Sequence, residues 1–361
     1  MTIEIVMIGL YLIGIFTALV VAHELGHMWV AKWYRMWVQE FAIGMGPLLL
    51  RLGKDRSGTL YTVRALPIGG FVRIAGMMPD EESVEGGFQS KPLHARFLTV
   101  LAGPVASFLF GFLLLVLIGL TAGLPAGKPT PQVRFVQPDS PAQQAGLRIG
   151  DVLLAINNTP IDTIEAASKI IRANANQSLT LTVRRGQETL TLRATPRLEE
   201  ERDRNGHVQK IGRIGVVWRT ERQPQPLTTV FGHAGRLSVA IVLGIGESLY
   251  RLLSGKGNIH EVGSLISIAS ATGATAQLGF VEVVDFAAAF SIMLGVVNLL
   301  PIPVLDGGYL LIFTIEAIRR RKLSPEMMAR VQIAGLVIVI AIFLTVFSLD
   351  IYKLLTGKLI R

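Results

Sequence analysis

The fold is decided by one stretch of sequence, Ile5-Val-Met-Ile-Gly-Leu-Tyr-Leu-Ile-Gly-Ile-Phe-Thr-Ala-Leu-Val-Val-Ala22-His23-Glu24-Leu25-Gly26-His27. Residues 5–22 carry no charge and are long enough to enter a membrane as a helix. The two histidines at i and i+4 share one face of that helix and can hold one Zn²⁺, with Glu24 beside them as a general base. The pattern alone also arises by chance on solvated helices. Ionisable groups at the edge of an apolar span are unfavourable, however, and usually functional.

The composition sets the class of protein. Hydrophobic residues make up 50% of the 361 residues, charged residues only 17%, and the mean hydropathy is +0.49. These values are too apolar for a soluble chain and predict a polytopic α-helical membrane protein. Because cysteine is absent, disulfides, thiolate ligands and thiol nucleophiles are excluded, and His, Asp and Glu remain as metal ligands. The net charge of +9 fits basic loops beside a lipid bilayer, and no nucleic-acid partner is expected.

Four charge-free stretches predict four transmembrane helices, at Ile5–Ala22, Phe97–Gly127, Phe286–Leu305 and Val331–Leu349. We expect the first to be retained rather than cleaved as a signal peptide, because an acidic Glu4 precedes it and a basic leader is lacking. A further apolar stretch, Leu227–Leu253, contains His233, Arg236, Glu247 and Arg251. It predicts an interfacial amphipathic helix; a fifth span, which would have to bury these charges, is the alternative.

Basic residues predict the orientation in the membrane. They gather between the first two spans and between the last two, where Arg319-Arg320-Arg321-Lys322 lies. Short loops of this composition remain on the cytoplasmic side. The metal motif should therefore face the cytoplasm, and the region from Thr121 to Asp285 should be extracytoplasmic.

The segment Phe41–Gly76 is expected to form β-hairpins associated with the membrane, beside the metal helix. Gly44 and Gly46 make its start glycine-rich, and Thr59–Arg64 alternates as a strand does. Non-helical backbone at membrane depth is tolerated where protein or a water-filled cavity covers it, so this element would suit a site that admits an extended peptide. An ordinary cytoplasmic β loop is the alternative.

A soluble α/β module is expected between the second and third spans, over Val133–Leu198. A helix pattern at Ile164–Ala173 lies among four strand patterns, at Val133–Val136, Asp151–Ile156, Leu179–Arg184 and Thr189–Arg193. The stretch Ser140-Pro-Ala-Gln-Gln-Ala-Gly146-Leu147, with Ile149-Gly150-Asp151 after it, resembles the signature of bacterial PDZ domains. That resemblance implies a groove that captures a peptide ligand by β-augmentation; a spacer domain without a ligand is the alternative.

Asp306 is the candidate third protein ligand of the metal. It lies in Asn298-Leu-Leu-Pro301-Ile-Pro303-Val-Leu305-Asp306-Gly307-Gly308, at the end of the third span. Two prolines and two glycines must break the helix there. An aspartate at this depth is unfavourable unless paired, and the histidine pair still lacks a third protein ligand. A helix cap or an ion-pair partner is the alternative role.

Together these features resemble the site-2 protease family of intramembrane zinc metalloproteases, in particular its bacterial RseP and RasP type. The resemblance rests on His23-Glu24-Leu25-Gly26-His27, Leu305-Asp306-Gly307-Gly308, Ala102-Gly103-Pro104 and the single PDZ-like module. It implies Zn²⁺ as the cofactor, with His23, His27 and Asp306 as ligands and Glu24 as the general base. It also places Gly44 and Gly46 in the family's membrane-reentrant β loop, and Asn298 in its substrate-binding segment.

The resemblance implies a protease of the bacterial inner membrane that cuts transmembrane segments of single-pass membrane proteins. Anti-sigma factors or remnant signal peptides would be substrates, after a first cut outside the membrane. Three positions depart from the family pattern: Ser107 where asparagine is frequent, Tyr309 where histidine is frequent, and Ser264 where proline is usual. None of them removes a metal ligand. Some members carry two PDZ modules in tandem, whereas this chain carries one.

The expected domain order is a membrane half at 1–127, the PDZ-like domain at 128–198, a linker with the amphipathic helix at 199–285, and a second membrane half at 286–361. Two other functions share parts of this pattern. An inactive scaffold would act through the PDZ-like groove alone, but all four catalytic residues are present. A metal transporter would carry polar groups along a path through several spans, whereas here they gather at one face.

Overall fold

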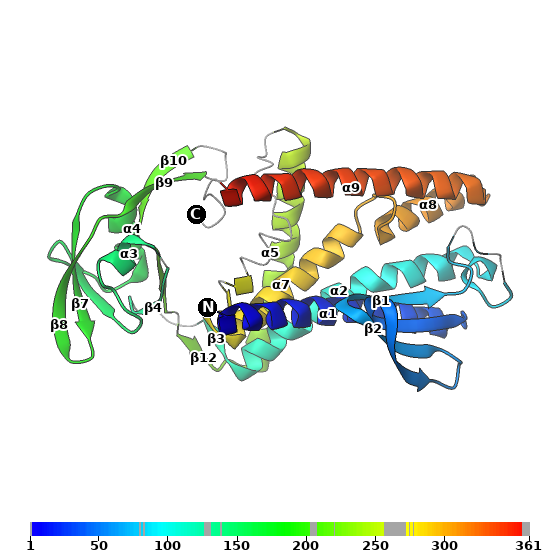
Figure 1. Ribbon diagram of the computed structural model, residues 1–361, viewed down its shortest axis with the longest axis horizontal. Helices are drawn as coiled ribbons and strands as arrows, with labels where there is room; N and C mark the ends of the chain where they lie inside the picture. The colour runs from blue at the N-terminus through cyan, green and yellow to red at the C-terminus, as the bar shows by residue number, and fades with distance from the viewer. Residues whose placement is uncertain are drawn as a thin grey trace. The chain divides into compact units, whose positions relative to one another are not determined.

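The computed structural model describes residues 2–78, 81, 84–125, 131–137, 139–202, 208–219, 221–255, 272–273, 275–276 and 278–355. The chain forms two compact units, coloured by residue number in Figure 1. Residues 1–117 and 231–361 make up the first unit, and residues 118–230 make up the second. The family departure at Ser264 lies outside the described residues.

Long apolar helices dominate the first unit. The described helices that contribute to it are α1 (Thr2–Trp33), α2 (Leu93–Thr121), α5 (Leu227–Leu253), α7 (Phe280–Asn298), α8 (Asp306–Arg319) and α9 (Pro325–Leu355), with a short 3-10 helix at Phe88–Ser90. All except α8 and the 3-10 helix are long and apolar enough to cross a membrane, which makes five candidate spans. Because α5 is one of the five, the expected count of four is not confirmed.

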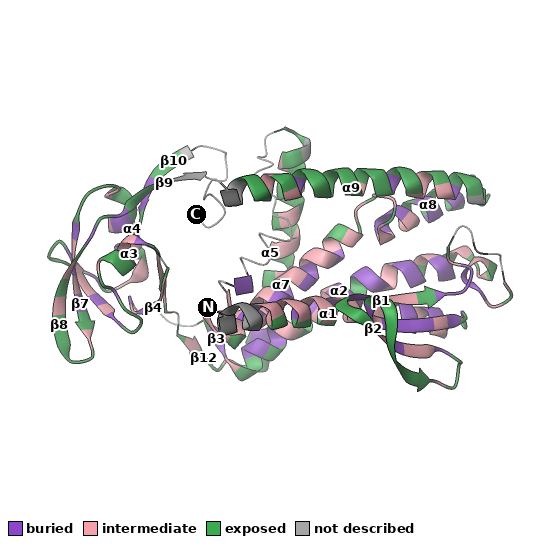
Figure 2. Cartoon of the chain, in the orientation of Figure 1, coloured by how far each residue is buried: buried purple, intermediate pink, exposed green. Residues whose placement is uncertain are grey.

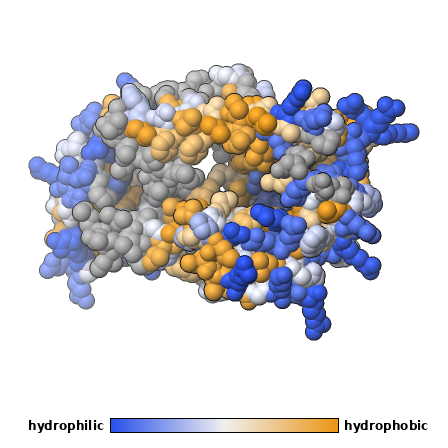
Figure 3. Space-filling model, turned by 45° about the vertical axis from the view of Figure 1, so that its right-hand side comes forward, coloured by the Kyte–Doolittle hydropathy of each residue, from blue (hydrophilic) through white to orange (hydrophobic). Residues whose placement is uncertain are grey.

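Exposed apolar side chains cover these helices. On α9 they include Val337, Phe343 and Leu344, and on α2 they include Leu109 and Leu113. Most of α9 is exposed in Figure 2, and hydrophobic residues form a broad area of the surface in Figure 3. Lipid tails are as apolar as these side chains, so the faces suit a bilayer rather than water.

Helices α1, α2 and α7 pack around one apolar cluster. Ile15 and Leu19 of α1 lie against Val283 and Ala287 of α7, with Leu114 of α2 beside them. Small residues bring α2 and α7 close together, as is common between membrane helices. A Cβ atom at Gly111 would lie only 2.6 Å from the carbonyl oxygen of Ala288.

The expected β element is present. Strands β1 (Val38–Lys54) and β2 (Leu60–Ile74) pair antiparallel with repeated register shifts. Residues 40–43 pair with both 60–63 and 70–73, so the two strands fold back on themselves into a curled sheet. Gly44 permits the closest approach, because its φ is 85° and a Cβ there would lie 2.5 Å from the carbonyl oxygen of Leu66.

The second unit contains a small α/β module. Its main sheet has the order β6-β5-β7-β8 and packs with two helices over a buried core that includes Leu153, Ile156, Leu181 and Val183. The elements are β4 (Val133–Val136), α3 (Pro141–Gln144), β5 (Val152–Ile156), β6 (Thr159–Pro160), α4 (Ile164–Ala173), β7 (Leu179–Arg185) and β8 (Glu188–Ala194). Each strand and helix predicted in this stretch is confirmed to within one residue at either end.

This unit continues beyond the predicted limit at residue 198. The additional pairs are β9 (Arg197–Arg202) with β10 (Val208–Arg213), β11 (Val216–Trp218) with β4, and β12 (Arg222–Gln223) with β3 (Leu124–Pro125). The region expected to be a linker from residue 199 therefore begins within a strand, since β9 extends to Arg202. The register places residue 200 of β9 opposite residue 210 of β10, and a run of charged residues alone does not signal such a pairing.

Candidate metal centre

Helix α1 carries the histidine pair. The helix runs through the motif without a break and ends at Trp33, so both imidazoles lie on one face. His23 and His27 are buried, at 7% and 6% exposure, and their Nε2 atoms are 3.2 Å apart.

Asp306 reaches this face from the other end of the sequence. Helix α7 ends at Asn298, short of the predicted limit at Leu305, because prolines in the following turn cannot continue it. Val304 takes a φ of 83°, in the left-handed region that β-branched residues rarely adopt. A Cβ at Gly307 would lie 2.2 Å from the carbonyl oxygen of Leu300. This compact turn starts α8 with Asp306 as its first residue.

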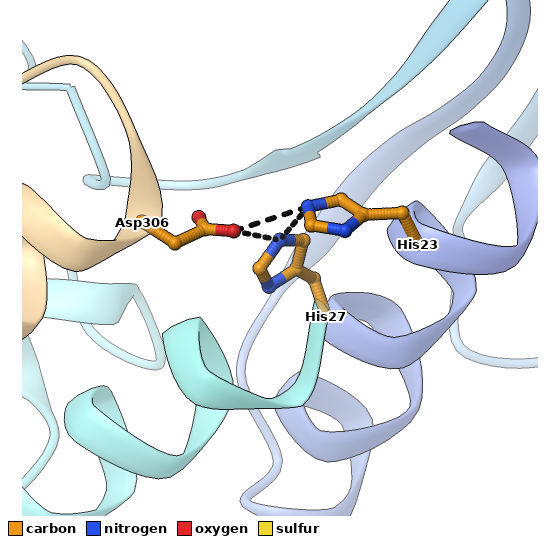
Figure 4. A group of neighbouring side chains, drawn as sticks. All are labelled: His23, His27 and Asp306. Atoms are coloured by element: carbon orange, nitrogen blue, oxygen red, sulfur yellow. Dashed lines mark hydrogen bonds and ion pairs between the residues drawn. The ribbon is translucent and has the colours of Figure 1, made fainter. Parts of the chain in front are cut away.

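The three side chains converge, as Figure 4 shows. Asp306 Oδ2 lies 3.0 Å from His23 Nε2 and 3.5 Å from His27 Nε2. All three ligand atoms lie within 4.8 Å of one another. Among the described residues, no hydrogen bond of good geometry reaches the buried Asp306 Oδ2. Two imidazole nitrogens and a carboxylate oxygen directed at one point form a donor set that zinc uses in catalytic sites, so the residues fit this ion.

Hydrogen bonds on the far side of each ring orient these nitrogens. His27 Nδ1 lies 2.8 Å from the carbonyl oxygen of Thr99. A carbonyl only accepts, so Nδ1 carries the hydrogen and the Nε2 lone pair of the neutral ring points to the centre. His23 Nδ1 lies 2.9 Å from Ser107 Oγ, and Ser291 Oγ donates to the Ser107 carbonyl oxygen at 2.7 Å. The departure from the family pattern at residue 107 thus keeps a polar contact to the ring.

Two glycines make room for the imidazoles where α1 crosses α2. A Cβ at Gly103 would lie 2.2 Å from His27 Nε2 and 2.8 Å from His23 Nε2, and a Cβ at Gly26 would lie 2.3 Å from the carbonyl oxygen of Ala102. Side chains cannot occupy either space. The Ala102-Gly103-Pro104 motif therefore has a physical role, since its glycine lets both histidines approach α2.

The β-hairpin holds the candidate base. The backbone N–H of Val72, in β2, donates a hydrogen bond to Glu24 Oε2 at 3.0 Å. Glu24 is half-buried and directly follows the first histidine of the motif. One strand of the predicted β element therefore orients a carboxylate beside the convergent ligand atoms.

The other predicted site residues lie in β1 and at the end of α7. Gly44 and Gly46 take φ angles of 85° and 82°, and Asn298 is the last residue of α7 and half-buried. Among the described residues, no hydrogen bond or ion pair joins these three to His23, His27 or Asp306. The structure therefore brings the three proposed ligands together, and a role of these three residues in substrate binding stays a prediction. Tyr309, which also departs from the family pattern, hydrogen-bonds with the Gln332 side chain of α9.

Sequence reasoning missed Thr99, Val72 and Ser291. Two of them act through backbone atoms, which no residue pattern identifies. A weak signal existed for the third, because Ser107 and Ser291 are hydroxyl residues inside charge-free stretches.

Comparison with known proteins identifies the family. The pattern that defines peptidase family M50 matches residues 11–342 of this chain. The chain belongs to peptidase family M50. The resemblance to the site-2 proteases, drawn from the motifs, is thereby confirmed.

Relatives of this M50 peptidase match over nearly their whole length. A protein of Mesorhizobium japonicum is 32% identical, covering 94% of this chain and 96% of its own. Zinc metalloprotease RasP of Geobacillus kaustophilus is 30% identical, covering 94% and 97% respectively. The regulator of sigma-W protease RasP of Bacillus subtilis is 28% identical, also covering 94% and 97%. This M50 peptidase is an intramembrane zinc metalloprotease, with Zn²⁺ as its cofactor.

Comparison with solved structures finds a PDZ domain. The PDZ domain of an SdrC-like protein from Listeria monocytogenes aligns with 26% of this M50 peptidase and 90% of its own chain, at 17% identity and a TM-score of 0.20.

Proposed function

We propose that this M50 peptidase cuts peptide bonds within the transmembrane segments of single-pass membrane proteins, with His23, His27 and Asp306 as the zinc ligands and Glu24 as the general base. The observation that carries the proposal is the convergence of the three ligand atoms within 4.8 Å, from two helices far apart in the sequence. A helix cap or an ordinary ion pair would not require both histidines to direct Nε2 at one carboxylate oxygen.

Each residue has a defined part in the reaction. Zinc, when bound, supplies a Lewis acid that polarises the scissile carbonyl and activates water. Glu24 takes a proton from the attacking water at its carboxylate and returns it to the leaving amine nitrogen. The Val72 N–H fixes Glu24 Oε2 during both transfers. Thr99 and Ser107 hold the far sides of the imidazoles, so the ligand nitrogens keep their direction.

The substrate must unwind before it is cut. A transmembrane helix hides each peptide bond in an i to i−4 hydrogen bond, so only an extended segment exposes the scissile bond. The hairpin that bonds Glu24 offers strand edges for such a segment, and Gly44 and Gly46 shape it. Asn298, at the end of α7, would contact the same segment. Residues that break helices should therefore favour cleavage when they lie in the substrate.

The biological setting follows from the charge pattern and from the family. In this proposal the protein lies in the bacterial inner membrane with its active site toward the cytoplasm, and the PDZ-like module is extracytoplasmic. Anti-sigma factors or remnant signal peptides are the substrates, after a first cut outside the membrane. The module contains none of the proposed catalytic residues, so it acts as a size filter on the extracytoplasmic side.

Deletion of the module tests the filter. The deletion should remove residues 131–219, because β11 completes a sheet with β4 and a shorter deletion would leave that strand unpaired. With a flexible linker in its place, untrimmed substrates should be cut while short substrates are cut at an unchanged rate. If the untrimmed substrate stays uncut, the filter lies elsewhere in the chain.

The catalytic assignment is tested by zinc content and cleavage measured on the same purified proteins. His23→Ala, His27→Ala and Asp306→Ala should each lose both zinc and cleavage of a transmembrane substrate. Glu24→Gln should keep zinc and lose cleavage, since it removes the proton acceptor and no ligand. Gly14→Ala is a matched control on α1, because a Cβ there meets nothing within 4 Å. Wild-type cleavage by the Asp306→Ala protein would remove that residue from the site.

A further inference from the structure

A second charged cluster lies at the other end of α8, away from the metal ligands. Arg96 of α2 is 2% exposed, and its Nη2 donates to Glu316 Oε2 at 2.9 Å. The side chain of Glu316 is 3% exposed. Neither residue belongs to a motif recognised in the sequence, and the proposed mechanism uses neither.

This ion pair joins four segments of the chain. The Arg96 guanidinium lies 5.0 Å from the centre of the Phe313 ring, and its Nη1 donates to Gln89 Oε1 at 3.4 Å. Glu316 Oε1 accepts from the backbone N–H of Leu323 at 3.0 Å, in the loop before α9. The helices α2 and α8, the 3-10 turn at residues 88–90 and the α8–α9 loop are thereby held at one point.

The energetics argue that the pair specifies geometry rather than adding stability. Two charges removed from water recover their desolvation cost only with complete hydrogen bonding. Here Arg96 Nε, which is buried, has no hydrogen-bond partner among the described residues. Apolar residues of similar volume would often stabilise such a position as well or better. The pair therefore contributes mainly by fixing the orientation and alignment of α8 against α2.

The same two helices also contact the metal site. Helix α8 begins with Asp306, and α2 contributes the Thr99 and Ser107 contacts to the histidines. Ten residues separate Asp306 from Glu316, a rise of about 15 Å along a helix. A tilt of roughly 5° about the ion pair would therefore move Asp306 by about 1.3 Å. Zinc–ligand distances tolerate only about 0.2 Å.

We propose that Arg96 and Glu316 are positioning residues that set α8 against α2 and so hold Asp306 at bonding distance from the zinc ion. The inference rests on the proposed function, in which Asp306 is a ligand. Without the pair the chain keeps its histidines and its fold, but α8 no longer presents the third ligand in one fixed place.

Zinc affinity of the full-length protein in detergent tests this inference. The dissociation constant is measured by competition with a chromophoric chelator, and the geometry is followed by the visible absorption of the Co²⁺-substituted protein. Glu316→Gln and the double variant Arg96→Met with Glu316→Leu should each weaken zinc binding roughly 10-fold. Their Co²⁺ spectra should shift toward that of Asp306→Ala. Arg96→Lys, which keeps the charge but loses the planar fork, should lie between them and the wild type.

The double variant keeps the test decisive, because it leaves no unpaired buried charge and should fold even where a single variant does not. Asp151→Asn is the matched control, since it removes the buried carboxylate that pairs with the partly exposed Arg185 in the second unit and should leave zinc affinity unchanged. A folded double variant that binds zinc within twofold of the wild type, with an unshifted Co²⁺ spectrum, would overturn the positioning role. Unchanged affinity in Asp306→Ala would instead overturn the ligand assignment itself.

Discussion

Replacing Gly103 by alanine should disrupt the metal centre by a single methyl group. The new Cβ would lie 2.2 Å from His27 Nε2, and ordinary van der Waals contact begins at 3.4 Å, so the nitrogen must move by 1.2 Å (3.4 − 2.2). His23 Nε2, at 2.8 Å, must move by 0.6 Å (3.4 − 2.8). Both displacements exceed the roughly 0.2 Å over which zinc–ligand distances vary. We therefore expect zinc binding to weaken about 100-fold, or about 2.8 kcal/mol.

The assay is zinc affinity by chelator competition, with thermal stability of the metal-free protein measured in parallel. Gly119→Ala is the matched control on the same helix: its Cβ would lie 2.6 Å from Val230 Cγ1, and so it strains packing without touching an imidazole or a residue that contacts one. It should lower stability and leave zinc affinity near that of the wild type. Zinc binding by Gly103→Ala within twofold of the wild type would show that the rings do not occupy the position described.

Two further substitutions each test one part of the protein without changing the proposed zinc ligands: the first tests the general base, and the second tests the stability of the PDZ-like module. Val72→Pro removes the backbone N–H that donates a hydrogen bond to Glu24, and it should lower turnover at least 10-fold with zinc content unchanged. The control Val72→Ala keeps that N–H and should be near wild type. Equal rates for the two variants would mean that the hydrogen bond does not orient the base. Burial alone would raise the pKa of Asp151, but hydrogen bonds from Arg185 and the Arg148 backbone lower it below the ordinary value of 3.8. A carboxyl group with a depressed pKa stabilises the fold above its unfolded pKa and loses that contribution as pH falls through the folded value. The stability advantage of wild type over Asp151→Asn should thus be full at pH 7 and shrink below about pH 3.8, as thermal unfolding at several pH values would reveal.

The sequence was sufficient for features that local pattern determines. The apolar run before His23 predicted α1, and alternation predicted β7 and β8 to within one residue. The three candidate ligands were found because ionisable residues inside apolar stretches are conspicuous. Spacing alone then indicated which two share a helix face.

Features that depend on a distant partner could not be predicted. Because spans were predicted as charge-free stretches, the second span was expected to begin at Phe97. Helix α2 instead starts at Leu93 and includes Arg96, which is neutralised by Glu316 of α8. The start of α7 was also misplaced, because Glu282 and Asp285 lie within the helix. The contacts that Thr99 and Val72 make through backbone atoms depend on how helices and strands pack, and no residue type signals them.

The burial of Arg96 has a consequence for biosynthesis. Its carboxylate partner is 220 residues further along the chain, so the arginine has no Glu316 to pair with while α2 is being inserted. At about 5 to 20 residues per second, synthesis of the intervening chain takes roughly 10 to 45 s. We expect the first turn of α2 to stay near water during that interval, because a charged side chain without a partner is unfavourable in lipid, and Asp306 has not yet been made for most of it. We therefore expect the proposed metal centre to be assembled late, when the newly inserted C-terminal helices dock, since a nascent chain that still lacks them has only a histidine pair.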